Sequence, residues 1–486
     1  DYLKLAKFRR ALGVRRVLAL TATATPKVSA EIRRYFGIAA ADHIRLSFHR
    51  PNLDLRVTPC AATDRKQILL DRLAAIDGPV VVYVTRQETA EEVATFLKRH
   101  DVSARAYHAG LPDEFRSDAQ RAFMAGETRV IVATIAFGMG IDKADIRGVI
   151  HYNLPKSLEN HTQEIGRAGR DGRPAVCEML ACADDLTVLE NFIHSDTPSP
   201  RALGNLIDRV LRLGDEFDIS LYDLSVSCDI RTTVISTLLA YLETDGILEA
   251  RGVFYGTYKL KLLRDRERIT AGMPPRERKF VESLLERGKA GRSWLTFEPS
   301  TLAAELGVTR EKIVAALGSL EAAGDAALAL AGVRHGYRIK KPAGDLHDLT
   351  DRYAAVFQKR EQADLVRLSQ VPGISAHRGC LTDYLTRHFG ERLSAPCGHC
   401  DRCRGVSATV IRRSPARRPS DEEWQSARDL ARANHSELAT PRQLARFLCG
   451  MTSPATIRAR LTRHNAFGMW SDLPFAEVIA ITEALS

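Results

Sequence analysis

Features typical of membrane and secreted proteins are missing from this sequence of 486 residues. It has no run of 18 or more apolar residues, and its first ten residues, DYLKLAKFRR, lack the hydrophobic stretch of a signal peptide. Its nine cysteines are an odd number, five scattered and four clustered, which does not suit a disulfide framework. We therefore expect a soluble cytoplasmic chain without a membrane partner.

Two phosphate-binding motifs are absent as well. Neither G-x-x-x-x-G-K-[ST] nor a D-E-x-H box occurs, and the nearest candidate, Gly288-Lys289, lacks the earlier glycine and the Ser/Thr. What the chain does have is a formal net charge of +10 and a pI near 9.2, which favour a polyanionic partner. Its length suits about three or four domains.

The most informative stretch is residues 129–172. The apolar run 130–132 predicts a buried parallel strand, and the small residues of 134–140 predict a turn where a backbone can approach a ligand. A second strand is expected at 148–152, and Ser157 stands where a helix would begin.

That helix is expected to carry Gln163, Arg167 and Arg170 on one face, because they are spaced at i, i+4 and i, i+3. Two arginines on one face, beside a glycine-rich turn at the end of a parallel sheet, suit a site that stabilises charge on a phosphoryl group. The alternative is a solvated basic helix, although the surrounding strands and turns favour the phosphoryl site.

Strands and helices alternate around this stretch, which is typical of a parallel α/β sheet. The sequence predicts strands at 80–84, 104–107 and 175–181 and helices at 88–99 and 113–124. Nearer the start it predicts a buried strand at 16–20, a turn at 21–24 and a helix from Pro26 to near Gly37.

Two long segments, ATIAFGMGIDK at 133–143 and QEIGRAGRDG at 163–172, resemble the second motor domain of superfamily 2 helicases, and more narrowly the RecQ family of DNA helicases. LTATATP at 20–26 and SFHRPN at 47–52 resemble other segments of that family. By this resemblance, Arg170 is the arginine finger that reaches the γ-phosphate of ATP bound with Mg²⁺, and Arg167 is its companion. The resemblance also makes Gln163 a coupling residue, Asp142 a ribose contact and Gly140 a neighbour of the nucleotide.

The resemblance implies the C-terminal portion of an ATP-dependent DNA helicase that moves 3′→5′ on single-stranded DNA and unwinds duplex DNA in repair and recombination. The missing motifs should lie upstream of Asp1, so we expect a fragment that is inactive by itself. The whole protein is expected to be a monomer at the bacterial nucleoid. Two alternatives are an RNA-directed helicase and a non-motor DNA-binding protein whose winged helices and zinc are the working parts.

DNA contacts are expected at the carboxyl ends of the strands, where ligands of such sheets bind. The resemblance assigns them to Thr85, Arg86, His108, Gly110 and Thr134 and, in the first motor domain, to Thr21 and Thr23. Free N–H groups of the following helices suit DNA phosphates, although ordinary turn chemistry would also account for these residues.

After the last predicted strand, two segments repeat with an offset of 78 residues, which sets Ile235 on Ile313. Each predicts a helix, a turn, a longer helix and a glycine-containing β-hairpin, as in winged helices that bind DNA or pack against proteins. In the first hairpin, at 251–258, Phe254 and Tyr255 are candidates to wedge against a terminal base pair. The alternative is the apolar half of an ordinary hairpin.

A metal site is predicted by C-x16-C-x2-C-x2-C, a closed structural Zn²⁺ site made by Cys380, Cys397, Cys400 and Cys403. The RecQ family has a zinc module of this kind, but there it precedes the winged helix, which leaves its placement against the motor domain open here. A basic linker, SATVIRRSPARRPS, follows. The core of the last segment is expected to contain Leu444, Phe447, Leu448, Ile457, Leu461, Phe467 and Trp470.

We therefore predict an α/β RecA-like motor domain followed by mostly helical winged-helix-like units, a small zinc module and a C-terminal helical domain. The expected boundaries are 1–45 for the end of a first RecA-like domain, 46–195 for the second, 196–270 and 271–345 for the winged-helix-like units, 346–406 for the zinc module, 407–420 for the linker and 421–486 for the helical domain.

Overall fold

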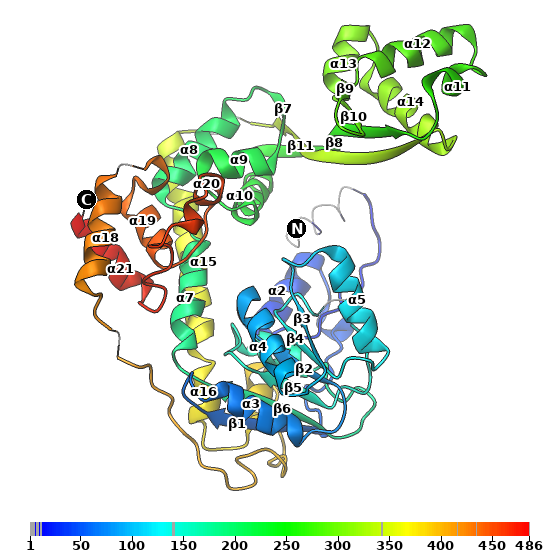
Figure 1. The fold of residues 1–486 in the computed structure, drawn as a ribbon. Helices are drawn as coiled ribbons and strands as arrows, with labels where there is room; N and C mark the ends of the chain where they lie inside the picture. Colours follow the sequence, from blue (N-terminus) through cyan, green and yellow to red (C-terminus); the bar gives the residue numbers. More distant parts are fainter. Residues whose placement is uncertain are drawn as a thin grey trace. The chain divides into compact units, whose positions relative to one another are not determined.

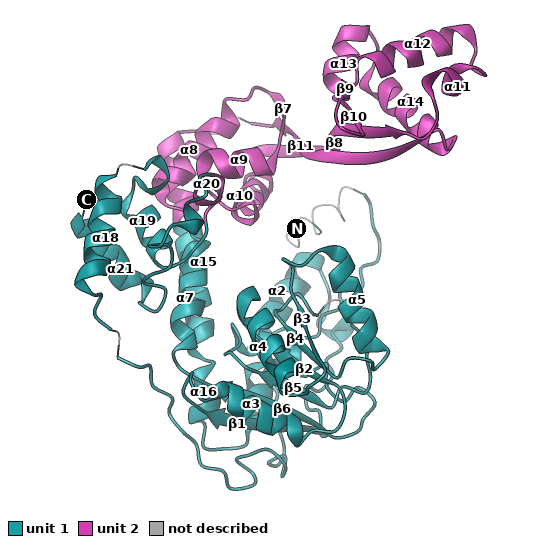
Figure 2. Ribbon diagram, in the orientation of Figure 1, with its two compact units in different colours: residues 1–197, 355–452, 459–486 teal, residues 198–354, 453–458 magenta. Residues whose placement is uncertain are grey.

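The computed structural model of the chain describes Leu5, Arg9 and residues 12–138, 141–341, 344–415, 417–433 and 435–485. The chain divides into two compact units (Figure 2). Unit 1 comprises 1–197, 355–452 and 459–486, and unit 2 comprises 198–354 and 453–458. Among the described residues, no helix combines the length and the apolar character needed to cross a lipid bilayer.

Unit 1 is built on a six-stranded parallel sheet with the order β1-β6-β5-β2-β4-β3 (Figure 1). Its strands are β1 (Leu53–Pro59), β2 (Val80–Tyr83), β3 (Ala104–Tyr107), β4 (Val130–Ala133), β5 (Gly148–His151) and β6 (Ala175–Ala181). β2, β4 and β5 are buried along their whole length, as expected for apolar runs with helices on both faces. All the strands predicted between residues 80 and 181 are confirmed, within a residue or two at their ends.

Helices cover both faces of this sheet. They are α3 (Arg65–Ala74), α4 (Gln87–Arg99), α5 (Asp113–Met124), α6 (Leu158–Ile165) and α7 (Asp185–Ser195). Because neighbouring residues of a strand point to opposite faces, Val80 and Val82 belong to the core that holds α3 and α4, while Val81 belongs to the core that holds α5 and α6. The helices predicted at 88–99 and 113–124 are confirmed, whereas β1 and α3 were missing from the sequence-based prediction.

The N-terminal segment differs from its prediction in one respect. α2 (Pro26–Phe36) begins after Thr25, whose hydroxyl accepts a hydrogen bond from Val28 N, and ends at Gly37, as predicted; η1 (Ala40–Asp42) follows. The strand predicted at 16–20 is wrong, because these residues form no strand and Leu18 is 82% exposed. An apolar run becomes a strand only where a neighbour pairs with its backbone, and none of the described strands pairs with this one.

A later part of unit 1 packs on the outer edge of the sheet. α15 (Leu346–Ser369) leads to α16 (Pro372–Ala376), α17 (Leu381–His388) and a cysteine-rich loop, and we call residues 372–404 the cysteine module. Asp401 N donates to Leu55 O (3.0 Å) and Asp401 Oδ2 accepts from Val57 N (2.8 Å). The module thereby covers the open edge of β1, so it packs directly on the α/β domain although unit 2 separates the two in sequence.

Unit 2 contains two copies of one helix–turn–helix pattern. α9 (Leu221–Cys228) and α10 (Thr232–Thr244) precede β8 (Leu248–Leu262), just as α13 (Pro299–Leu306) and α14 (Arg310–Ala322) precede β11 (Ala326–Ile339). Each element of the second copy begins 78 residues after its counterpart (299 against 221), so the repeat is confirmed. The other elements are α8 (Pro200–Leu211), β7 (Glu216–Ile219), α11 (Arg266–Thr270), α12 (Pro275–Glu286), β9 (Lys289–Ala290) and β10 (Leu295–Phe297).

The glycine-containing hairpins predicted after these helix pairs are wrong. β8 runs straight through 251–258 and pairs with β11 along its length in one antiparallel ribbon, and the second helix pair is inserted between the two strands (Figure 1). The glycines allow the strands to approach instead of turning them: a Cβ on Gly256 would lie 3.2 Å from Gly332 O. The prediction failed because an alternating pattern specifies a strand but not its partner.

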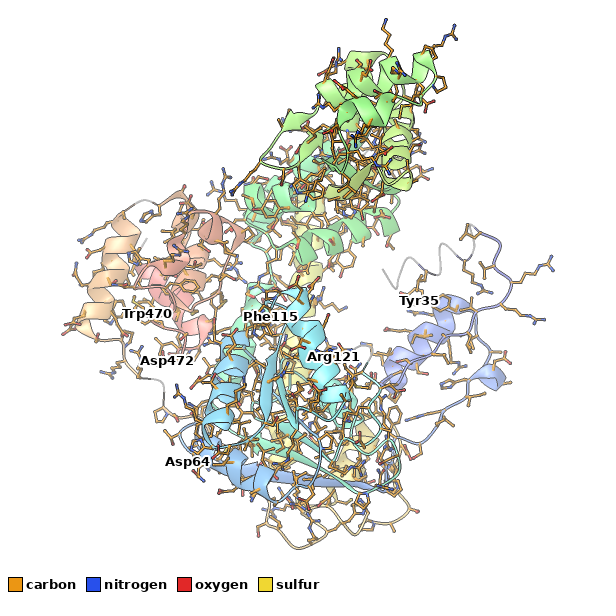
Figure 3. The ribbon with its side chains drawn as sticks, turned by 45° about the vertical axis from the view of Figure 1, so that its right-hand side comes forward. Tyr35, Asp64, Phe115, Arg121, Trp470 and Asp472 are labelled. Atoms are coloured by element: carbon orange, nitrogen blue, oxygen red, sulfur yellow. The ribbon has the colours of Figure 1, made fainter. Side chains whose placement is uncertain are left out.

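The C-terminal segment contains α18 (Asp421–Arg432), η2 (Ser436–Leu438), α19 (Pro441–Leu448), α20 (Pro454–Arg458), η3 (Leu461–Arg463) and α21 (Phe475–Leu485). Of the residues predicted for its core, Leu444, Phe447, Leu448 and Trp470 are buried, and Leu461 and Phe467 are partly buried against them. The prediction for Ile457 is wrong, because its side chain is 57% exposed. Arg417 of the linker forms an ion pair with Asp472 (2.6 Å), which is labelled with Trp470 in Figure 3.

Candidate functional site

The two arginines predicted to share a helix face lie on a turn. α6 ends at Ile165 and is followed by residues 166–172, which we call the arginine turn. The prediction that Gln163, Arg167 and Arg170 share one face of a helix is therefore wrong. Gly169 then redirects the chain: its φ of 54° is left-handed, and its N–H donates to Ile146 O (2.9 Å), which returns the chain to the sheet. Gln163 is exposed on the last turn of α6.

Arg167 points into the domain. It is 9% exposed and donates a hydrogen bond to Gly138 O, while the Tyr83 hydroxyl donates to the neighbouring Phe137 O (2.9 Å). A Cβ on Gly138 would lie 2.7 Å from Arg167 Nη2, so the guanidinium fits there because residue 138 is glycine. Arg167 and Tyr83 therefore hold the turn after β4 from inside the domain.

Arg170 lies at the surface of the same turn. Its Nη1 forms an ion pair with Asp142 Oδ1 (2.7 Å) and also donates to Ile141 O (3.3 Å). The Arg170 side chain is 36% exposed and that of Asp142 87% exposed. The structure thus brings Arg170 and Asp142 together at an open surface, where a guanidinium can meet an anion from outside the domain. Gly140, predicted to lie beside the nucleotide, falls outside the described residues.

Two residues that the sequence-based site omitted hold the arginine turn in place. Arg50 Nη2 donates to Gly169 O (2.8 Å) and Ala168 O (3.2 Å). Asn52 Nδ2 donates to Gly169 O (2.7 Å) and Arg173 O (2.9 Å). Both belong to residues 47–52, the crossover segment, whose SFHRPN sequence was the available signal. The backbone beside Arg170 is therefore anchored from outside the turn.

Gly169→Ala is expected to lower the free energy of unfolding by about 2–4 kcal/mol, because the substitution strains a left-handed residue and crowds its neighbours. The new Cβ would lie 2.4 Å from Asn52 Nδ2 and 2.7 Å from Arg173 O. Gly172→Ala is the matched control: its φ is also positive (80°), but its Cβ would have no neighbour within 4 Å, so a loss of about 1–2 kcal/mol is expected. Urea denaturation measures the free energy of unfolding of both variants. An equal decrease in the two would show that crowding against Asn52 does not destabilise the protein.

Five predicted DNA contacts lie at the carboxyl ends of β2, β3 and β4, which are neighbours in the sheet. Thr85 and Thr134 are partly exposed there, and Thr85 N donates to Asn153 Oδ1 (3.2 Å). Neither Arg86 before α4 nor Pro112 before α5 caps its helix with a side chain. The first N–H groups of both helices therefore lack the usual side-chain acceptor and face the same edge of the sheet.

The other predicted DNA contacts are buried or lie close to neighbouring side chains or backbone. His108 is 3% exposed, and its Nε2 lies 3.1 Å from Glu91 Oε1. Gly110 is exposed, but the Gln87 side chain lies close enough that a Cβ on Gly110 would meet it at 2.2 Å. In the N-terminal segment, the Thr21 hydroxyl accepts a hydrogen bond from Thr23 N (3.4 Å) at an exposed turn.

Phe254 and Tyr255 point to opposite faces of the ribbon formed by β8 and β11, as successive residues of a strand do. Phe254 lies partly buried beneath Arg310, whose guanidinium carbon is 4.7 Å from the ring centre. Tyr255 is 39% exposed and lies opposite Val333. Of the two rings, that of Tyr255 is therefore the more accessible one.

The four predicted metal ligands come together in the cysteine module. Their sulfur atoms all lie within 4.8 Å of one another, with 3.8 Å between Cys397 and Cys403 and 4.0 Å between Cys400 and Cys380. A tetrahedral Zn²⁺ with Zn–S bonds of about 2.3 Å holds its sulfurs about 3.8 Å apart. The cluster therefore fits Zn²⁺, and four thiolates leave no open coordination position for catalysis.

Backbone N–H groups also favour thiolates at this site. Cys397 N donates to Cys380 Sγ (3.3 Å) and Cys400 N to Cys397 Sγ (3.4 Å). Burial opposes ionisation of Cys397, but the nearby Thr382 hydroxyl and hydrogen bonds from backbone N–H groups lower its pKa to about 6. Burial and the neighbouring thiols instead raise the pKa of Cys403 to about 12. Ionising all four thiols at neutral pH thus calls for a bound cation.

Comparison with known proteins finds one family match over the arginine turn and another over the cysteine module. The family model of the helicase conserved C-terminal domain matches residues 64–172, and that of RecQ zinc-binding matches residues 344–404. ATP-dependent DNA helicase Q-like 5 of Arabidopsis thaliana is 24% identical over 482 residues, which are 95% of this chain and 52% of that protein.

Two other relatives are more similar over a shorter stretch. ATP-dependent DNA helicase Q4 of Homo sapiens is 36% identical over 230 residues, covering 43% of this chain and 19% of that protein. Probable ATP-dependent DNA helicase RecS of Bacillus subtilis is 39% identical over 221 residues, which are 45% of this chain and 44% of that protein. The chain spans about half, or less, of the length of these curated relatives.

Proposed function

Because this chain belongs to the RecQ-like superfamily 2 helicases, we propose that it forms the C-terminal portion of an ATP-dependent DNA helicase that moves 3′→5′ on single-stranded DNA and unwinds duplex DNA in repair and recombination. One observation carries the proposal: the guanidinium of Arg170 is exposed on a turn whose backbone Arg50 and Asn52 hold in place. The names of the relatives supply the ATP and DNA parts.

In this proposal ATP with Mg²⁺ supplies the phosphoryl group and is bound mainly by a first motor domain that carries the phosphate-binding loop. Arg170 completes the site from this chain by placing its guanidinium where charge develops on the γ-phosphoryl oxygens. Asp142 is the ribose contact of this proposal, and its 2.7 Å ion pair with Arg170 places the two side chains in the same site. Arg167, which is buried, keeps the turn rigid, and Gln163 lies one turn earlier as the coupling residue.

DNA in this proposal runs along the carboxyl edge of the sheet. The uncapped N-termini of α4 and α5 offer N–H groups to backbone phosphates, beside Thr85, Arg86 and Thr134. Thr21 and Thr23 contact the strand from the N-terminal segment, and Gly110 contacts it through its exposed backbone; the buried His108 is the least accessible of the proposed contacts. Closure of the two motor domains on ATP and reopening after hydrolysis then move these contacts alternately along the strand.

Unit 2 supplies the duplex contacts in this proposal. Its two helix–turn–helix pairs contact the duplex, and the exposed ring of Tyr255, more than the covered ring of Phe254, suits stacking on a base. Packing against another protein is the alternative use of these pairs, and the second candidate function is a DNA-binding protein without motor activity.

We expect single-stranded DNA to stimulate ATP hydrolysis by the full-length protein, and an RNA strand of the same sequence to stimulate it much less. The comparison uses the initial rate of phosphate release at matched nucleotide concentrations. Equal stimulation by RNA would favour an RNA-directed motor. No stimulation by either strand would favour the non-motor DNA-binding protein.

A further inference from the structure

We infer that the cysteine module positions the arginine turn, and that Glu391 is the residue through which it does so. The inference rests on the proposed role of Arg170 and adds a residue far from it in sequence. Two sets of contacts meet in the crossover segment: one comes from the cysteine module, and the other goes to the arginine turn.

Glu391 holds the backbone of the crossover segment at its start. Its two carboxylate oxygens accept hydrogen bonds from the Ser47 hydroxyl and from Phe48 N (2.7 Å). The Phe48 ring stacks on Phe389, with the ring centres 4.3 Å apart and the planes 12° from parallel. Phe389 is itself fully buried, so the segment is fixed by charge-assisted hydrogen bonds and by an aromatic contact at the same point.

The other end of the crossover segment holds the arginine turn. Arg50 and Asn52 make four hydrogen bonds to the carbonyl groups of Ala168, Gly169 and Arg173. Pro51 restricts the backbone between them, and Leu53 N donates to Arg50 O (3.1 Å) in a tight turn. In the inferred arrangement, a displacement of Phe48 shifts Arg50, two residues later, relative to the turn that carries Arg170.

The cysteine module is a firm support because it is fixed to the sheet at a second place. Asp401 pairs with the backbone of β1, and Arg404 forms an ion pair with Asp54 at 2.8 Å. The cysteine ligands surround Asp401 in sequence and keep its loop closed. The crossover segment thus lies between two anchored bodies, and Glu391 acts on Arg170 through Arg50 without touching nucleotide.

The test compares Glu391→Ala with Glu391→Gln in the full-length protein. Alanine removes both acceptors, so kcat for DNA-stimulated ATP hydrolysis is expected to fall about 10- to 100-fold through misplacement of Arg170, while KM for ATP stays unchanged. Glutamine is expected to restore most of kcat, because its carbonyl can accept from Phe48 N and its amide can donate to the Ser47 oxygen. Glu422→Ala, an exposed glutamate on α18, is the matched control and should keep the parent rate.

Zinc content and the unfolding temperature of each variant are measured beside the kinetics. One zinc per chain and a cooperative unfolding transition in Glu391→Ala, together with low kcat, support a positioning role; a modestly lower unfolding temperature is expected from the loss of its two hydrogen bonds. Parent kcat in Glu391→Ala, a parallel loss of zinc, or a glutamine variant as slow as the alanine variant would overturn it. Arg170→Ala is assayed alongside. If both alanine variants keep the parent kcat, the proposed function fails. If kcat falls in Arg170→Ala but not in Glu391→Ala, only this inference fails.

Discussion

Arg170→Ala is expected to slow DNA-stimulated ATP hydrolysis by about 10³-fold or more, the effect of losing an arginine finger in a phosphoryl-transfer site. The guanidinium is held 2.7 Å from Asp142 on an anchored turn, so a flexible replacement from solvent cannot reproduce its position. Phosphate release at saturating DNA and ATP measures the effect.

Arg170→Lys is the control for this result. Lysine keeps the positive charge but not the planar fork of donors, so we expect it to recover only part of the rate. DNA affinity in the absence of nucleotide should be the same in all three proteins, since the predicted DNA contacts lie at the ends of β2, β3 and β4. An alanine variant with the parent rate of hydrolysis would contradict the assignment of Arg170.

Cys400→Ser is expected to abolish zinc binding and to lower the free energy of unfolding by more than about 4 kcal/mol, as loss of a structural metal does. Cys400 is fully buried, and its sulfur accepts a hydrogen bond from Leu381 N (3.4 Å) at the start of α17. Without the metal, the loop that carries Asp401 loses its closure, and the edge of β1 is uncovered. Zinc stoichiometry and thermal unfolding measure the two effects.

Cys228→Ser is the matched control because Cys228 lies on α9 of unit 2, outside the metal cluster. This variant should keep one zinc per chain and nearly all of its stability. Prolonged treatment of the parent protein with a chelator should reproduce the Cys400→Ser unfolding temperature. A Cys400→Ser protein that retains zinc at the parent stoichiometry would refute the four-thiolate site.

Local features of this fold were predictable because local chemistry determines them. The apolar run 130–132 became β4, and Pro26 and Gly37 mark the ends of α2 through helix capping. The x2 spacing of the last three cysteines indicated the metal cluster, because so short a spacing keeps the three sulfurs close together. The Arg170 site was predicted through a family resemblance and stays a prediction; the structure adds only that Arg170 lies at the surface next to Asp142.

Features that depend on distant partners were not predictable. Residues 16–20 have the composition of a strand but no described strand to pair with, and residues 251–258 pair with β11 instead of folding back. The helical spacing of Arg167 and Arg170 continued past Ile165, whereas the helix ends there, and the turn that follows is held at Gly169 by Asn52 from far away in sequence. Tertiary hydrogen bonds decided each case.

The insertion between β8 and β11 also affects how the protein is made. β8 ends at Leu262, and its partner β11 begins only after another 63 residues (263–325) have been synthesised. At about 5–20 residues per second, the nascent strand waits roughly 3–13 s with its backbone open to other chains. The exposed Lys259 and Lys261 oppose such association through charge. Translation speed, and not only the stability of the finished fold, thus bears on how much of this protein escapes aggregation.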